Sequence, residues 1–245
     1  MPKISIKPEV VFHLFDFPVT NSLLTATIVV FVFFFVALRY YREASSNKKT
    51  GFYYFFQFII KSIYSLFESV LGEKTKYFFP LLFSFFMFII LQNWFGLLPG
   101  IGSLLVLVEE HGEEVFVPLF RGGNADLNTT FVLAITSVVM IQVFGVKFLG
   151  SKGYLKKFIN FTNPINFFLG LLEIVSELSK ILSFSFRLFG NIFAGEVLLT
   201  IVAFLVPILA SFPFIILEVF VGFIQALVFS MLTAVFISGA IASHH

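Results

Sequence analysis

The chain is organised around the stretch SFSFRLFGNIFAGE, residues 183–196, inside an apolar run that extends from residue 165 to residue 206. A run of this length is sufficient to cross a lipid bilayer as a helix. Its middle nevertheless carries an arginine, Arg187. An arginine at the bilayer centre costs about 2.5–3.5 kcal/mol on insertion scales, and a neutral residue would avoid that cost. We therefore interpret Arg187 as a functional residue and ask what it pairs with.

A polar stripe runs along the same predicted helix. At about 100° per residue, its members fall within roughly 40° of one line through Arg187. The other members are Glu173, Lys180, Ser183 and Asn191. Glu196 points to the opposite side, about 13 Å further along the axis, and Glu173 lies about 21 Å away in the other direction. This pattern suits an ion path interrupted by a positive barrier. The alternative is a buried helix whose charges pair only for assembly.

The composition is that of a membrane protein. Of the 245 residues, 58% are hydrophobic and 12% are charged, whereas soluble domains carry about 25% charged residues. We expect a single membrane domain over residues 1–245. The absence of cysteine excludes disulfides and thiol chemistry, and a net charge of +2 is too small to indicate nucleic acid as a partner. The sequence has no cofactor, metal or catalytic-triad motif, so we expect no cofactor and no catalytic site of its own.

The apolar runs predict an all-α polytopic fold. We expect about five membrane-embedded helices, at residues 19–38, 77–98, 127–149, 165–206 and 214–240. Residues 1–18 are expected to form an external N-terminal segment. Residues 52–71 are apolar but carry Gln57, Lys61 and Glu68, which is typical of an amphipathic or interfacial helix, or of a poor span.

Local signals indicate where some of these helices begin and end. Asn21 or Ser22 is expected to cap the first helix. Arg39 and Arg42 follow its uncharged core and are expected to end it. Asp126 precedes the third helix as a plausible N-cap residue.

The loop charges predict the orientation of the chain. The loops after the first and third helices are basic, whereas the loop after the second, residues 99–126, is acidic. Because positively charged loops remain in the cytoplasm, we expect the amino terminus outside and the carboxyl terminus in the cytoplasm. The glutamates at 109–114 are interpreted as a solvated surface. His111 lies among them, but without a second ligand it is a weak metal signal.

A second polar stripe lies on the last helix. Glu218, Gly222 and Gln225 at i, i+4 and i+7 share one face. Gly222 allows another helix to approach closely, and Glu218 is a natural partner of Glu196 or Arg187. Two neighbouring buried carboxylates raise each other's proton affinity, so that one titrates near neutral pH as part of a coupled pair. A proton relay needs this property. The alternative is a pair that shares a proton for structural reasons alone.

Several segments together resemble a known family. RLFGNIFAGE, residues 187–196, closely resembles the hallmark of subunit a of F-type ATP synthases. QNWFGLLPG at 92–100 is similar to the family's Asn-x-x-Gly-Leu-x-Pro element. NADLNTT at 124–130 is similar to the segment in bacterial members that leads from the loop into the following helix. The position of Glu173, fourteen residues before the arginine, also matches the family. The arginine motif is the specific signal, and the resemblance covers most of the chain.

The resemblance implies a stator subunit whose last two helices are long and tilted against a rotating ring of c subunits, with two offset proton half-channels. Arg187 would be the essential arginine that faces the ring. The half-channel from the outside would be lined by Asn191, Glu196, Glu218 and Gln225. Glu173 would belong to the cytoplasmic half-channel, and Asp126 would help at the outer mouth. The implied partners are the c-ring, the peripheral-stalk subunit b, the lipid bilayer and protons.

One feature departs from the family pattern. Many members have a histidine at one of the positions of Glu196 and Glu218, whereas both are glutamate here. A histidine relay is therefore excluded, and Na⁺ becomes an alternative to the expected proton. The bacterial-looking segments favour a bacterial plasma membrane over an organelle inner membrane. A function of another class also fits an intramembrane arginine, namely a self-contained secondary transporter in which Arg187 binds an anionic substrate. The inverted repeats common in such transporters are not visible.

Overall fold

The computed structural model describes residues 7–15, 17–98, 100–110, 113–158, 163–205 and 211–242. Within this part of the chain, five helical segments are long and apolar enough to cross a membrane. The prediction of an all-α polytopic membrane protein is therefore confirmed. The helices are α1 (Asn21–Ala44), α2 (Gly51–Leu71), α3 (Thr75–Gly96), α4 (Leu127–Leu149), α5 (Ser151–Phe158), α6 (Pro164–Leu205) and α7 (Ser211–Ala240).

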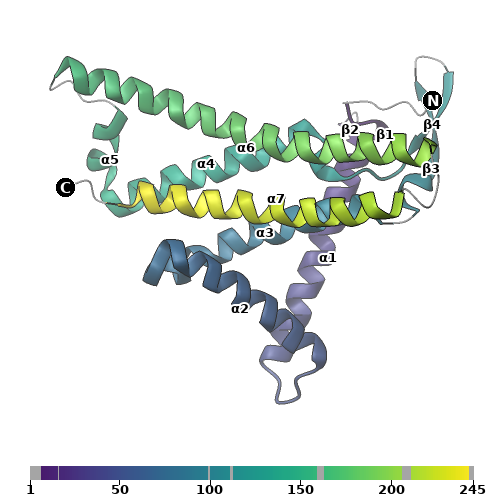
Figure 1. Ribbon diagram of the computed structural model, residues 1–245, viewed down its shortest axis with the longest axis horizontal. Coiled ribbons are helices and arrows are strands. Elements are labelled where there is room, and N and C mark those ends of the chain that lie inside the picture. Colours follow the sequence, from purple (N-terminus) through teal and green to yellow (C-terminus); the bar gives the residue numbers. More distant parts are fainter. Residues whose placement is uncertain are drawn as a thin grey trace.

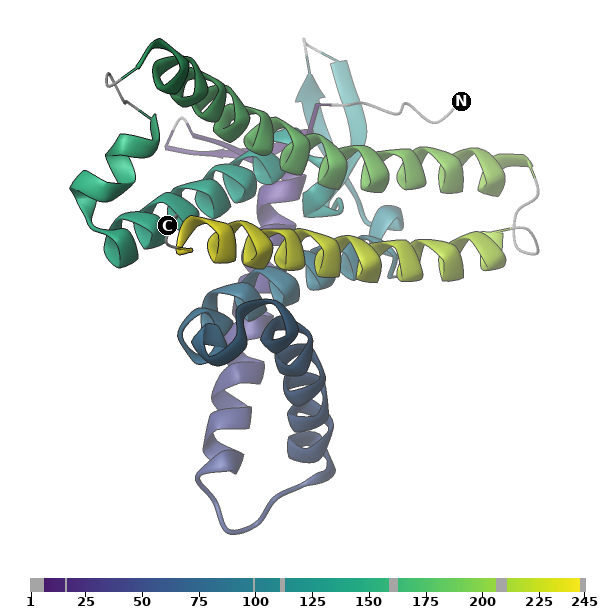
Figure 2. The same cartoon turned by 60° about the vertical axis from the view of Figure 1, so that its left-hand side comes forward.

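The helices α6 and α7 form the long axis of the molecule. They run antiparallel, side by side, and α1 crosses their direction steeply (Figures 1 and 2). At about 1.5 Å per residue, the 24 residues of α1 match the thickness of a bilayer, whereas the 42 residues of α6 are about twice as long as a bilayer requires. A helix of that length stays within the membrane only when it is strongly tilted. The predicted break at 206–213 falls mostly outside the described residues, since 206–210 are not among them.

The helix α1 differs from the predicted range 19–38 at its end. It continues to Ala44 because Arg39 does not stop the helix but pairs with Glu43 one turn later, with Nε 3.2 Å from Oε1. The guanidinium of Arg39 also lies 4.4 Å from the ring centre of Phe52 on α2. At the start, the N-cap is Thr20, whose hydroxyl accepts a hydrogen bond from the backbone N–H of Leu23.

The residues expected to cap α1 have other partners. Asn21 Nδ2 donates to the backbone oxygen of Pro118 at 3.3 Å. The hydroxyl of Ser22 donates to Asp126 Oδ2 at 2.8 Å. The expectation of a cap at Asn21 or Ser22 is therefore wrong by one or two residues, because tertiary contacts turn both side chains towards the interior.

Two hairpins lie on one side of the long helices, towards the end of the long axis where α6 ends (Figure 1), and Figure 2 shows them set back from the ends of α6 and α7. In the N-terminal segment, β1 (Val10–Leu14) pairs antiparallel with β2 (Phe17–Thr20). The acidic segment after α3 is not an irregular loop, since β3 (Leu105–Glu110) pairs antiparallel with β4 (Glu113–Pro118). His111 lies outside the described residues.

The helix α2 covers the range expected to be amphipathic or interfacial. It buries one face, formed by Ile63, Phe67 and Leu71 at intervals of four residues, against the bundle. A short 3-10 turn, η1 (Gly72–Lys74), joins it to α3. Its depth in the membrane stays a prediction.

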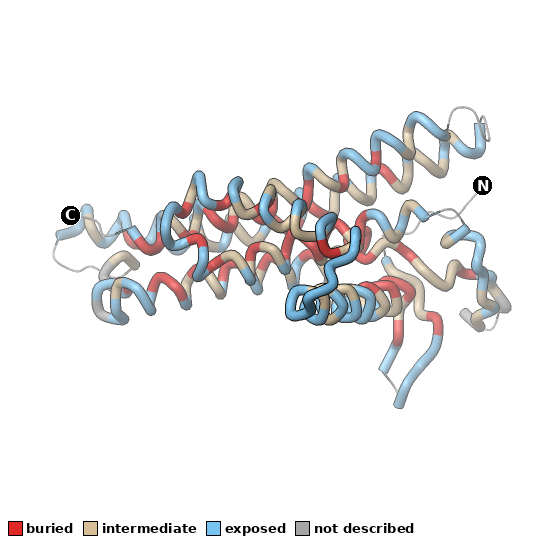
Figure 3. Tube along the Cα trace, turned by 90° about the horizontal axis from the view of Figure 1, so that it is seen from below, coloured by how far each residue is buried: buried red, intermediate tan, exposed pale blue. Residues whose placement is uncertain are grey.

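The core lies where α3, α4, α6 and α7 overlap, and the remainder of α6 is largely exposed (Figure 3). Aromatic rings join three of these helices, because the ring of Phe229 lies 5.6 Å from that of Phe85 on α3 and 4.9 Å from that of Phe184 on α6. The exposed face of α6 is mainly leucine and phenylalanine. Such a face suits lipid or another membrane protein rather than water.

Candidate functional site

Arg187 lies on the exposed face of α6. Its Nη2 donates to Ser183 Oγ at 3.2 Å, one turn earlier on the predicted polar stripe. Among the described residues, no carboxylate lies within ion-pair distance of its guanidinium. A charge in this position is costly in a membrane unless an anion from elsewhere compensates it.

The two predicted polar stripes meet one turn beyond Arg187. Asn191 Nδ2 on α6 donates to Gln225 Oε1 on α7 at 2.8 Å. Glu218, Gly222 and Gln225 are all buried, as expected for residues on one packed face of α7. A groove of about 440 Å³ between the two helices is lined by Asn191, Glu218 and Gln225, among others.

Glu218 reaches α6 where that helix has no side chain. A Cβ atom built on Gly195 would lie 2.1 Å from Glu218 Oε2, closer than real contacts allow. The carboxyl group therefore rests directly against the backbone at Gly195. Gly195 is not among the residues predicted from the sequence, although its position beside Glu196 in the hallmark stretch was a signal.

Gly222 allows the close approach that was expected, but the helix that approaches is α3. A Cβ atom on Gly222 would lie 3.0 Å from the Cβ of Asn93. Asn93 Nδ2 donates to the backbone oxygen of Gly222 at 3.0 Å, and Asn93 Oδ1 accepts from Asn124 Nδ2 at 2.7 Å. The asparagine of the Asn-x-x-Gly-Leu-x-Pro element therefore fixes α7 against α3.

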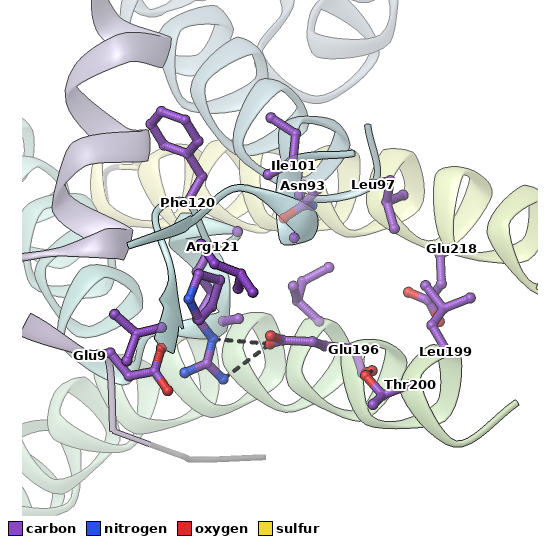
Figure 4. Close-up of a pocket in the computed structure, with 18 of the residues that line it drawn as sticks. Glu9, Asn93, Leu97, Ile101, Phe120, Arg121, Glu196, Leu199, Thr200 and Glu218 are labelled. Atoms are coloured by element: carbon purple, nitrogen blue, oxygen red, sulfur yellow. Dashed lines mark hydrogen bonds and ion pairs between the residues drawn. The ribbon is translucent and has the colours of Figure 1, made fainter. Parts of the chain in front are cut away.

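A cavity of about 600 Å³ opens on the hairpin side of α6 and α7. Figure 4 shows Glu9, Arg121, Glu196 and Glu218 on its walls, and Asn93 also lines it. Glu218 lines the groove between α6 and α7 as well, so its side chain is a wall common to both spaces.

Glu196 is paired with an arginine that the sequence analysis did not select. Its Oε2 accepts hydrogen bonds from Arg121 Nε at 3.2 Å and Arg121 Nη2 at 3.1 Å. Among the described residues, no hydrogen bond joins Glu218 to Glu196 or to Arg187. The expected partnership of Glu218 with either residue is thus not seen. Arg121 was visible in the sequence only as the single basic residue of an acidic segment.

Asp126 has a buried, structural position. Its Oδ1 accepts from the backbone N–H of Asn128 at 2.9 Å as the N-cap of α4, and its Oδ2 accepts from Ser22 on α1. Both oxygens are therefore engaged. Asp126 ends a turn, η3 (Gly123–Ala125), that begins two residues after Arg121 and thereby anchors the segment that carries this arginine.

A second charged cluster surrounds the beginning of α6. Glu173 Oε1 lies 2.7 Å from Lys157 Nζ on α5. Lys180 of the polar stripe pairs with Glu177 at 2.7 Å, another residue that the sequence analysis did not assign. Burial, with the negative charges of Glu177 and Glu173, raises the pKa of Tyr154 to about 12. Its hydroxyl therefore stays protonated at neutral pH and donates to Gln142 Oε1 at 2.6 Å.

Apart from Asp126, which caps α4, the structure separates the predicted residues into two groups. Arg187, Asn191, Glu196, Glu218 and Gln225 lie around the facing parts of α6 and α7, and Glu173 lies in the charged cluster near α5. The described residues contain no group of three or more histidines or carboxylates that could hold a metal ion.

Comparisons with known proteins agree with this arrangement. The sequence model of the family described as ATP synthase A chain matches residues 22–238. ATP synthase subunit a of Moorella thermoacetica is 28% identical over 98% of this chain and 99% of that protein. The subunit of Syntrophobacter fumaroxidans is 36% identical over 78% of this chain and 72% of that protein. The subunit of Legionella pneumophila is 28% identical over 95% of this chain and 91% of that protein. The matched region includes every helix that lines the cavity and the groove, and the chain therefore belongs to the subunit a family of F-type ATP synthases.

Proposed function

We propose that this chain is the stator subunit that guides protons to and from a rotating c-ring, with Arg187 separating two offset half-channels. The observation that carries the proposal is an exposed arginine on an apolar helix face, without a carboxylate partner among the described residues. A ring of carboxyl-bearing helices passing this face supplies the missing anion. Family membership favours this function over a self-contained transporter of an anionic substrate.

The outer half-channel follows the two spaces that share Glu218. A proton enters the cavity bounded by Glu196 and Glu218 and reaches the groove through the carboxyl group of Glu218. Asn191 and Gln225 line the groove between Glu218 and the ring, where their amide groups offer hydrogen bonds to the water along which the proton moves. Their mutual hydrogen bond supports this assignment, since it holds both amides at the depth next to Arg187. Asp126 contributes to the outer mouth indirectly by anchoring the segment that bears Arg121.

Arg187 acts as the barrier because its side chain does not release its proton at physiological pH. A ring carboxyl is neutral when protonated and tolerates lipid, whereas its ionised form requires a cation. Arg187 supplies that cation and cannot pass the proton on. A proton must therefore travel round with the ring before it reaches the other half-channel.

Glu173 is assigned to the cytoplasmic half-channel. Its ion pair with Lys157 lies at the end of α6 remote from the outer cavity, beside the basic segment that follows α4. The positive-inside rule puts that segment in the cytoplasm, with the amino terminus outside and the carboxyl terminus inside.

The partners in this proposal are the c-ring at the exposed face of α6, the peripheral-stalk subunit b and the bilayer. The similar bacterial proteins support a location in the bacterial plasma membrane. Protons are proposed as the transported ion, and ATP synthesis should proceed without added Na⁺. A requirement for Na⁺ would reassign the ion without changing the path.

The test uses the whole ATP synthase reconstituted in liposomes. Arg187→Ala should abolish ATP synthesis while the complex still assembles, because removal of the charge relieves an insertion cost. It should also allow passive proton flux through the membrane sector without rotation. Arg187→Lys should be nearly as damaging, since lysine lacks the planar fork and deprotonates more readily. Arg39→Ala, at an exposed arginine far from the site, is the control.

Two results would contradict this proposal in different ways. Synthesis by Arg187→Ala close to the wild-type rate would make Arg187 a structural charge. Loss of synthesis without a proton leak would retain the pairing with the ring but remove the barrier role.

A further inference from the structure

A second arginine stands at the outer cavity. Arg121 is only 8% exposed, and it lies between β4 and η3, outside the hallmark stretch. Figure 4 shows its guanidinium directed at Glu196, which it contacts through two nitrogens. Its Nη1 also donates to the backbone oxygen of Lys7 at 3.5 Å, and its guanidinium carbon lies 5.9 Å from the ring centre of Phe193. Arg121 is therefore held from three sides.

The charges around the cavity are unevenly distributed. Among the described residues that line it, the charged side chains are Glu9, Arg121, Glu196 and Glu218. They come from the N-terminal segment, the segment after β4, α6 and α7, respectively. Arg121 is the one cation among these described lining residues. The ion pair is formed with Glu196, whereas Glu218 rests against the backbone at Gly195.

Glu196 and Glu218 differ in whether their protonation would leave a neighbouring positive charge without a counter-ion. Arg121 is permanently charged, so a proton on Glu196 would leave a buried guanidinium without its counter-ion, which is strongly unfavourable. A proton on Glu218 leaves no such charge, because no described cation lies within ion-pair distance of it. Glu218 is also the side chain common to the cavity and the groove.

We propose that Arg121 is a positioning residue that holds Glu196 as a fixed anion on the cavity wall, and that Glu218, rather than Glu196, is the carboxyl group of the outer half-channel that takes up the transported proton and releases it towards the ring. The inference rests on the proposed function and deepens it. The expected coupled pair of glutamates is thereby replaced by two separate roles. Glu196 stays ionised and attracts protons into the cavity, whereas Glu218 binds and releases the transported proton.

The experiment measures proton flux through the reconstituted ATP synthase as a function of the pH on the outer side. The variants are Arg121→Gln, Arg121→Lys, Glu196→Gln, Glu218→Gln and the double variant Arg121→Gln/Glu196→Gln. The wild type should show one titration step, and Glu218→Gln should lose it. In Arg121→Gln the freed Glu196 should add a second step, which Arg121→Lys should not show.

The double variant provides the sharpest comparison. Replacing Glu196 alone leaves the buried charge of Arg121 unpaired, and replacing Arg121 alone leaves the partly exposed charge of Glu196 unpaired, whereas the double variant leaves neither. Its flux should therefore be at least about threefold higher than that of either single variant, with one titration step as in the wild type. Additive losses, or an unchanged pH profile in Arg121→Gln, would overturn the positioning role, because a merely structural arginine gives those results.

A second measurement covers variants that assemble but do not turn over. Infrared difference spectra of the purified complex between acid and alkaline pH report protonated carboxyl groups directly. The outer carboxyl band should vanish in Glu218→Gln, persist in Glu196→Gln and be joined by a second band in Arg121→Gln. A band that vanishes in Glu196→Gln would refute the inference. Normal flux in Glu218→Gln would instead refute the proposed path itself.

Discussion

Replacement of Gly195 by alanine tests whether the position of the Glu218 carboxyl group matters. The added Cβ would lie 2.1 Å from Oε2, 2.3 Å from Cδ and 2.4 Å from Oε1, whereas real Cβ contacts are at least 3.0 Å. The carboxyl group must therefore withdraw by about 0.9 Å, the difference between 3.0 Å and 2.1 Å. Because it is the end of a flexible side chain, the movement is inexpensive for folding but removes the group from its place between the two spaces.

We expect Gly195→Ala to assemble normally and to conduct poorly. Alanine is better than glycine in a helix by about 0.5–1 kcal/mol, which offsets part of any strain. A displacement of about 1 Å at a reacting group reduces rates by up to about a hundredfold. The assay is ATP-driven proton pumping by the reconstituted complex, with the yield of assembled complex measured in parallel.

Two further variants test whether any loss of pumping in Gly195→Ala comes from displacement of the Glu218 carboxyl group. Gly239→Ala adds a Cβ in open space on α7 and should leave pumping unchanged. Glu218→Asp shortens the side chain by one methylene, so that the shorter carboxyl group no longer meets the new Cβ. Gly195→Ala should therefore cost much less in the Glu218→Asp background than in the wild type. An equal cost in both backgrounds, or wild-type pumping by Gly195→Ala, would refute the reasoning.

Three further predictions concern topology and packing. Because the chain has no cysteine, an impermeant thiol reagent applied to intact cells should label Glu113→Cys but not Lys156→Cys, and the reverse pattern would invert the proposed orientation. Asn93→Ala removes two hydrogen bonds in the core and should lower the free energy of unfolding by about 1–3 kcal/mol, measured by denaturant titration in detergent. Gly145→Ala should lower the free energy of unfolding by about 1–3 kcal/mol in the same assay, because the added Cβ would lie 2.3 Å from the buried ring of Tyr154. An unchanged free energy of unfolding would show that α5 can shift.

The differences between expectation and structure have identifiable causes. Arg39 was expected to end α1, but an arginine is a good helix former, and its contacts with Glu43 and Phe52 extend the helix beyond the apolar core. The acidic segment was expected to be a loop, but the uninterrupted apolar runs at 105–108 and 115–117 on either side of the glutamates pair as a hairpin. In both cases a partner elsewhere in the chain overrode a local signal.

The sequence by itself determined the apolar helices, the cost of placing Arg187 within one of them, and the faces on which the polar residues lie. These properties depend on composition and on a period of 3.6 residues, which are local. Only the tertiary structure decided that Glu196 faces Arg121, that Glu218 rests on Gly195 and that Asn93 binds the backbone at Gly222. Helical periodicity gives the direction of a side chain but not which neighbouring helix it meets or how closely. Those contacts join residues tens of positions apart, and they form only when the small residues and cavities of packed helices set the distances.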